Sequence, residues 1–129
     1  MEKKYLSKII ASDNEGLQMI SACCAGAEVV VKDIKYLKKN KVFLLFLKRN
    51  KIETENESKK INSICKFDFV DRVKSKNIKQ EYVDQKLKLI TIDYLKNNDN
   101  YEISLIFTNN VYITLSTEII EVTLDDQNN

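Results

Sequence analysis

An apolar stripe at helical spacing comes first in the chain, carried by Leu17, Ile20 and Cys24. Apolar residues three to four positions apart fall on one face of an α-helix. Ser12 begins an S-x-x-E sequence with the spacing of a capping box, and Gly26 is suited to ending a helix. The pattern predicts one amphipathic helix over residues 13–25.

After Gly26 the apolar repeat shortens to two, which is typical of β-strands. The strands predicted from this alternation cover residues 28–37, 41–49, 61–78, 86–95 and 101–116. Both faces of 41–49 are apolar, so we expect this strand to be covered on both sides. The alternation breaks after Phe67, which predicts a bulge or bend within 61–78. The charged segment 50–60 is predicted to be an exposed loop.

The segment 101–116 has the pattern of a β-hairpin centred on Asn109-Asn110. A tight hairpin turn needs positive φ angles, and Asn tolerates them better than other non-glycine residues. A two-residue loop would place Ile106 opposite Ile113 and Phe107 opposite Tyr112. Residues 117–126 fit either a last strand or a short helix.

These elements predict an α+β, mainly β, fold with one N-terminal amphipathic helix followed by about six antiparallel strands. We expect a curved sheet or a barrel-like roll, with a pleckstrin-homology-like barrel as one form of it. The length fits a single domain over residues 1–129. Its ends, 1–11 and 126–129, are predicted to be flexible.

Charge and hydropathy narrow the class of protein. Lys and Arg number 21 and Asp and Glu 19, a formal net charge of +2, and the hydrophobic share is 43%. Such a balance does not favour nucleic-acid binding, which usually needs a dense basic surface. The longest apolar run, VFLLFL, is far shorter than the ~20 residues that span a bilayer. We therefore expect a cytoplasmic protein that does not contact the membrane.

The adjacent cysteines Cys23 and Cys24 are the most conspicuous chemical feature, with Cys65 the third of three. The chain contains no histidine and two glycines. Histidine-dependent catalysis and a Gly-rich phosphate loop are therefore excluded. Three thiols without histidine do not complete a zinc site by spacing. We predict no cofactor and no metal, and we interpret the cysteines as small buried residues.

Four stretches together resemble a known family: SDNEGLQMISA, VFLLFLKRNKIE, SICKFDFVDRV and ISLIFTNNVYITLSTEIIEVTLDD. From about Ile10 to Asp126, the chain is similar to the alphaproteobacterial proteins of domain-of-unknown-function family 2948. The residues that match the family pattern are Arg49, Glu53, Glu118, Ile120, Glu121, Leu124 and Asp126. The resemblance implies a small cytoplasmic domain without an assigned activity.

The candidate binding residues are Arg49, Glu53, Glu118 and Glu121, and no catalytic residue is predicted. Arg49 and Glu53 come where a strand enters a polar segment, a common place for binding residues. Alternatively, Arg49 and Glu53 form only a surface ion pair that stabilises the fold by less than ~1 kcal/mol. We favour a non-catalytic module that binds a protein, itself or another. The alternative is a small-ligand-binding protein or a carboxylate-dependent enzyme with its site near Arg49 and Glu53.

Overall fold

The computed structural model describes residues 8–54, 57–79 and 81–127, and the side chains of 51–58 lie outside the described part. Within it the chain is mainly β with one α-helix, as the apolar pattern predicts. In chain order the elements are β1 (Lys8–Ala11), α1 (Asn14–Cys24), β2 (Glu28–Leu37), the 3-10 turn η1 (Lys38–Asn40), β3 (Val42–Thr54), β4 (Glu57–Phe67), β5 (Val70–Lys76), β6 (Lys86–Asn97), β7 (Asn100–Phe107), β8 (Tyr112–Thr117) and β9 (Val122–Asp126).

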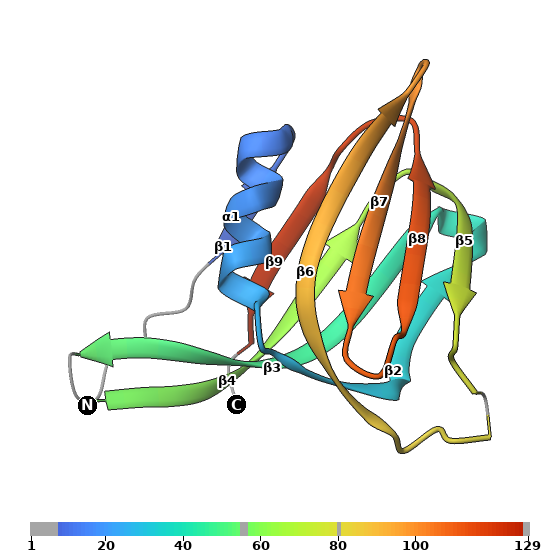
Figure 1. Cartoon of the computed structure of the whole chain (residues 1–129). Coiled ribbons are helices and arrows are strands. Elements are labelled where there is room, and N and C mark those ends of the chain that lie inside the picture. Colours follow the sequence, from blue (N-terminus) through green and yellow to red (C-terminus); the bar gives the residue numbers. More distant parts are fainter. Residues whose placement is uncertain (1–7, 55–56, 80, 128–129) are drawn as a thin grey trace.

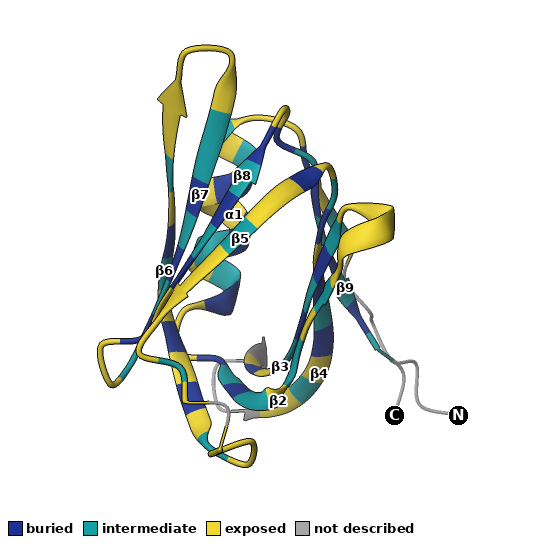
Figure 2. Cartoon of the chain, turned by 90° about the vertical axis from the view of Figure 1, so that its right-hand side faces the viewer, coloured by how far each residue is buried: buried dark blue, intermediate teal, exposed yellow. Residues whose placement is uncertain are grey.

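The nine strands of the described chain form one antiparallel sheet in the order β1-β9-β4-β3-β2-β6-β7-β8-β5. The sheet curves so that its two halves face each other, but it does not close, and β1 and β5 are its edges (Figures 1 and 2). Residues 28–30 of β2 pair with 86–88 of β6 and join the halves. The predicted strand count of about six is wrong, and the helix follows β1 instead of opening the fold.

The core lies between the two halves of the sheet, where the strands present their buried positions (Figure 2). The helix α1 packs against both β1 and β6, which lie in different halves, and so covers the inner face. Its buried residues are the predicted stripe of Leu17, Ile20 and Cys24. Among the described residues, no helix combines the length and the apolar character needed to cross a bilayer.

The helix begins and ends one residue inside the predicted range. Asp13, not Ser12, is the N-cap residue, and its carboxylate accepts a 2.8 Å hydrogen bond from the Gly16 N–H. A carboxylate at this end also carries negative charge toward the positive end of the helix dipole. Gly26 has a φ of +81°, in the left-handed region that glycine enters without a side-chain penalty. This residue turns the chain from α1 into β2.

Residues 50–60 do not form the predicted loop. Most of this segment lies in β3 and β4, which pair from Phe43↔Phe67 to Thr54↔Glu57 and form a ribbon that extends beyond the sheet (Figure 1). Residues 55–56 lie outside the described part. Cross-strand pairing provides hydrogen bonds for the backbone N–H and C=O groups, whatever the side chains are. A polar composition therefore does not exclude strands.

The predicted strand 61–78 is two strands. β4 pairs with β3 and β9, whereas β5 pairs with β8 in the other half of the sheet. Between them Phe69 has a φ of +60°, a conformation that bulky residues rarely adopt. The break in alternation after Phe67 therefore marks a change of partner strand, which is a larger event than a bulge.

The predicted hairpin forms, and Asn109 and Asn110 have φ angles of +62° and +58°. The predicted register is wrong by one residue, because Ile106 lies opposite Tyr112 and Leu105 opposite Ile113. The observed register pairs buried positions with buried positions across β7 and β8. A shift by one residue would pair each buried position with a solvent-facing one, so the core fixes the register.

Both predicted flexible ends contain ordered strand. Residues 8–11 form β1, which pairs with β9, and residues 122–126 form β9, which settles the choice between strand and helix in favour of the strand. Asp126 is buried in β9, and the Gln127 N–H donates to the Asn62 carbonyl at 2.8 Å. Residues 1–7 and 128–129 lie outside the described residues. We predicted flexibility because these residues lie near the ends of the chain. In the sheet, however, β9 lies between β1 and β4, and pairing with both neighbours orders it.

Candidate functional site

Arg49 does not lie on the surface as expected of a binding residue. It belongs to β3, and its alternation with Leu45 and Leu47 puts its side chain on the inner face, where it is 6% exposed. Glu53 also belongs to β3, but its side chain lies outside the described residues. The alternative of a surface ion pair is wrong for Arg49, because its guanidinium is buried.

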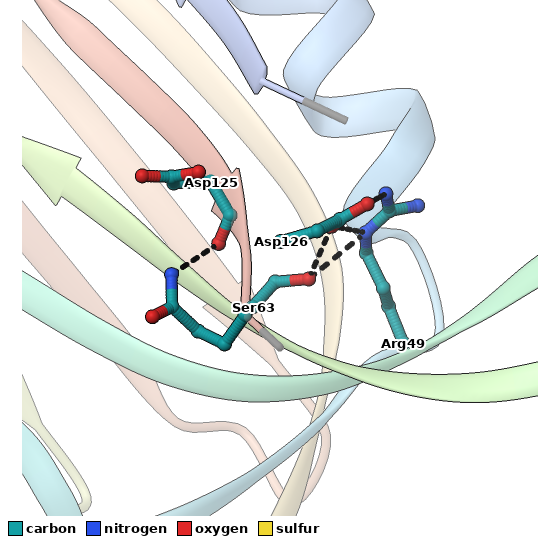
Figure 3. Close-up of polar contacts among 5 residues, drawn as sticks. Arg49, Ser63, Asp125 and Asp126 are labelled. Atoms are coloured by element: carbon teal, nitrogen blue, oxygen red, sulfur yellow. Dashed lines mark hydrogen bonds and ion pairs between the residues drawn. The ribbon is translucent and has the colours of Figure 1, made fainter. Parts of the chain in front are cut away.

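The partner of Arg49 is Asp126, from β9. Arg49 Nη2 lies 2.8 Å from Oδ1 and 2.9 Å from Oδ2 of the carboxylate, and Nε lies 3.1 Å from Oδ1 (Figure 3). Ser63, from β4, donates its hydroxyl to Asp126 Oδ1 at 2.7 Å and accepts from Arg49 Nε at 3.1 Å. A buried cation thus meets a buried anion with two-pronged geometry, the strong form of a charged hydrogen bond.

This network joins three neighbouring strands. Arg49, Ser63 and Asp126 come from β3, β4 and β9, and both charged side chains are at most 7% exposed. Burying either charge alone would cost several kcal/mol (~3–5), so the pair and the hydroxyl neutralise one another within the core. The guanidinium is occupied by Asp126, and the arrangement serves the structure by locking the relative positions of the three strands.

The structure does not bring Glu118 or Glu121 to Arg49. β9 starts at Val122 opposite Phe67 and ends at Asp126 opposite Ser63, so Glu121 and Asp126 lie at opposite ends of this strand. The backbone carbonyl of Glu121 accepts the Asp68 N–H at 2.9 Å. Glu118 is exposed after β8. The structure therefore does not place either of these two carboxylates beside the Arg49 guanidinium.

Glu118 belongs instead to the electrostatic surroundings of Lys41. The pKa of Lys41 is raised, chiefly by a hydrogen bond and charge from Asp71 at 3.0 Å, and in smaller part by the charge of Glu118. This group is exposed to solvent, so water screens the interaction. We interpret it as surface charge pairing at the end of the sheet where η1 meets β5.

A second feature of the core is a pair of buried thiols that no sequence pattern connects. Cys24 ends α1 and Cys65 lies in β4, and both are 0% exposed. Each of these two thiols is close enough to shift the pKa of the other. Cys23, the sequence neighbour, is half-buried. The prediction of small buried residues is confirmed for Cys24 and Cys65.

These two thiols shift each other's pKa in opposite directions. The pKa of Cys24 is lowered, first by the hydrogen bond from Cys65 and further by the positive charge of Arg49, against the opposing effects of burial and of Asp126. The pKa of Cys65 is raised well above its usual value by that same hydrogen bond and by burial. The positive charge of Arg49 therefore links Cys24 electrostatically to the ion pair.

An open groove of about 580 Å³ lies along β2, β3 and β4. Half-buried Phe46 and Ile64, which pair across β3 and β4, give it an apolar part. Its charged lining residues are Glu28, Asp33, Lys48 and Lys86. Two acidic and two basic groups leave the groove without net charge. Sequence reasoning missed it because a four-residue bulge of β2, between Val29 and Ile34, shapes it.

The described residues contain no group of three or more Asp, Glu or Cys side chains positioned to hold a metal ion. Asp126 and Ser63 are the site residues that sequence reasoning missed. The only signal for Asp126 was its match to the family pattern at the end of the chain, where we predicted flexibility. Nothing in the spacing of Ser63 distinguished it from other strand residues.

A family described as "Protein of unknown function (DUF2948)" matches residues 7–129. The chain belongs to this DUF2948 family. The match confirms the family that the four sequence stretches indicated, and it extends over all of the secondary structure described above. No curated protein and no solved structure matches the chain.

Proposed function

We propose that this DUF2948 protein is a non-catalytic interaction module that binds an extended segment of a partner protein along the free edge of β3. The observation that carries the proposal is the length of β3. Its pairing with β2 ends at Lys48, whereas its pairing with β4 continues to Thr54. Beyond Lys48, no described strand pairs with the outer edge of β3.

An unpaired strand edge offers a row of backbone donors and acceptors to another chain, and proteins use such edges for β-strand addition. The ribbon of β3 and β4 projects from the body of the sheet, where a partner can reach it (Figure 1). A two-stranded ribbon is only marginally stable alone. A third strand from a partner would both complete its pairing and stabilise it.

The chemistry of the core favours this reading over the enzyme reading. Arg49, the first candidate for ligand binding, has its charge occupied by Asp126. The candidate carboxylates Glu118 and Glu121 precede β9, whereas Asp126 is the last residue of that strand. Because the ion pair has a structural role in the core, it does not mark a binding site on the surface. The exposed ribbon of β3 and β4 is therefore the better candidate for a binding surface.

Site-specific photo-crosslinking in the native host tests the proposal. A photoreactive residue replaces exposed Asn50, on β3 just beyond Lys48, and in a matched control it replaces exposed Lys96 in β6. We expect one discrete adduct of defined partner from position 50 and none of that partner from position 96. The absence of an adduct at position 50, or the same adducts at both positions, would refute the proposal.

The neutral groove favours a second candidate function, binding of a small uncharged or zwitterionic ligand. Its volume of about 580 Å³ is within the range of ligand pockets, and its apolar part lies beside groups of both signs. Phosphate-rich ligands fit it poorly because its lining has no net charge. Amide chemical shifts of Phe46 and Ile64, measured while a mixture of neutral and zwitterionic metabolites is added, would test it. Unchanged shifts would reject this function.

A further inference from the structure

We propose that the free edge and outer face of β5 bind an extended acidic segment of a partner protein, one that carries Asp or Glu at every second position. β5 is an edge strand that pairs with β8, and no other described strand pairs with it. All its residues except Val70 and Val73 are exposed, and it lies at the front of the molecule in Figure 2. This surface is separate from the edge of β3, so the inference does not rest on the function proposed above.

The first residue of β5 is already covered, which fixes where the free edge begins. The Val70 N–H donates to the Lys41 carbonyl at 2.8 Å, and the Val70 carbonyl accepts from the Tyr36 hydroxyl at 2.8 Å. Residues 72–76 pair with 112–116 of β8, and their other edge has no strand beside it in the described part of the chain. The free edge therefore extends over about five residues, enough for one short strand.

From position 72 onward, every second residue of β5 is a cation: Arg72, Lys74 and Lys76. Val73, between the first two, packs against the core, so the three cations lie on the outer face of the sheet. Their partners across β8 are residues with hydroxyl groups: Ser116, Thr114 and Tyr112. Residues two apart along a strand are roughly 7 Å apart. The outer face of β5 is therefore a row of positive charges at the repeat of a β-strand.

This row has no compensating anion beside it. None of the ion pairs between described residues includes these three cations. Asp71, the acidic residue of β5, is bound to Lys41 at 3.0 Å. The outward-facing acid in the same part of the sheet, Glu102, belongs to β7, two strands away. Like charges at this spacing repel one another, and an anionic partner would relieve that repulsion.

An added strand with alternate acidic residues fits both features of β5. Its backbone would pair with the free edge, as in other complexes formed by strand addition. Its side chains on the outer face would repeat at the spacing of the cations, so that each carboxylate lies opposite one of them. Lysines on an edge strand hinder pairing with most other strands. Three cations in register would therefore repel basic strands and select acidic ones.

A single-stranded nucleic acid is the other polyanion that such a row could attract. Proteins that bind single strands stack the bases on aromatic side chains. Among the outward-facing residues of β5, β7 and β8 in the described chain, the aromatic one is Tyr112, which is 39% exposed. A nucleic acid also has no peptide groups to pair with the free strand edge. The acidic peptide is therefore the better match.

Nuclear magnetic resonance titration with two synthetic peptides tests the proposal. Both peptides contain three Glu and four Thr residues, but in one the Glu residues alternate with Thr and in the other they are adjacent. We expect the alternating peptide to shift the backbone amide signals of residues 71–76 and to slow their hydrogen exchange. It should bind at least about fivefold more tightly than the other peptide, since only one of its orders places a carboxylate opposite each cation. Added salt should weaken this binding.

Charge variants locate the site. Lys74→Gln should weaken binding of the alternating peptide about two- to fivefold, and Arg72→Gln/Lys74→Gln/Lys76→Gln should abolish it. Lys8→Gln is the matched control, because Lys8 is exposed on β1, the other edge strand of the sheet, and we expect no change in affinity. Arg72→Glu/Lys74→Glu/Lys76→Glu should instead bind a peptide with Lys in place of Glu, a rescue that a misfolded variant would not give.

Three outcomes would overturn the proposal. Equal affinity for the two peptides would show that net charge alone acts, without strand addition. Absence of shifts in residues 71–76 at several millimolar alternating peptide and low salt would show that β5 does not bind it. A seven-residue oligothymidylate that shifts the same signals at lower concentration than the peptide would assign the row to nucleic acid. Crosslinking from Asn50 concerns a different strand, so either proposal can fail without the other.

Discussion

Replacement of Arg49 by Met is the most informative perturbation of this fold. Met keeps an unbranched apolar side chain but removes the guanidinium that binds Asp126 through contacts of 2.8 and 2.9 Å. The Asp126 carboxylate would then be buried without its cation, and the hydrogen bond from Ser63 would remain. Asp126→Asn is the reciprocal change, since it keeps the shape of the side chain and leaves Arg49 as an uncompensated cation.

The loss of unfolding free energy expected for each variant follows from the burial of the ion pair. Breaking a buried ion pair by removing one partner costs about 3–5 kcal/mol, because an isolated charge is left in the core. The double variant Arg49→Met/Asp126→Asn contains neither charge, so it should lose much less than the sum of the single losses. We expect a coupling free energy of at least about 2 kcal/mol from the four proteins of this cycle.

Urea unfolding followed by far-UV circular dichroism measures these free energies, and it suits a chain without tryptophan. With a urea dependence of about 1–3 kcal/mol per molar, a loss of about 3–5 kcal/mol should lower the unfolding midpoint of each single variant by roughly 1–5 M. The exposed pair Lys32–Asp84, at 3.2 Å, is the matched control. We expect coupling below about 1 kcal/mol for Lys32→Met with Asp84→Asn.

A coupling at Arg49–Asp126 as small as that of the exposed control would refute the reasoning. It would mean that water reaches the ion pair, or that the two charges adjust independently. Additive losses of 3–5 kcal/mol from each single variant would refute it in another way, since the charges would then act through separate neighbours.

Two further predictions concern the packing of the core and of the helix. Thr117 is buried, and its hydroxyl has no hydrogen-bond partner among the described residues. Thr117→Val should therefore raise the free energy of unfolding by about 1 kcal/mol, as measured by urea titration. A decrease of similar size would contradict this prediction. A Cβ at Gly16 would lie 2.9 Å from the Ala11 Cβ, so Gly16→Ala should lower the thermal midpoint, at a cost of about 1–3 kcal/mol, although Ala favours helices. Gln18→Ala, at an exposed position of the same helix, is its control and should leave the midpoint nearly unchanged, so equal midpoints for the two variants would contradict the steric argument.

The sequence was sufficient for the features that depend on neighbours in the chain. The stripe of Leu17, Ile20 and Cys24 predicts α1, because helical periodicity is set within a few residues. Alternation predicts β2, β6 and the hairpin of β7 and β8, and Asn109-Asn110 predicts its turn. The family also follows from the sequence, since its motifs are local stretches.

The features that depend on distant partners required the tertiary structure. The polar segment 50–60 gave no sign of its pairing, because ladder hydrogen bonds are made by the backbone and leave no mark on composition. The hairpin register was missed by one residue, since burial on the inner face decides it and not the turn alone.

The candidate site also has features that the sequence predicts and features that depend on distant partners. The sequence by itself marked Arg49 as a candidate residue, since it lies where an apolar strand enters a polar segment and it matches the family pattern. Only the tertiary structure decided that Asp126 and Ser63 bind its guanidinium and that its charge acts on Cys24. A buried charge is neutralised by whichever opposite charge the fold brings within about 3 Å, and that choice depends on the order of strands β3, β4 and β9 in the sheet.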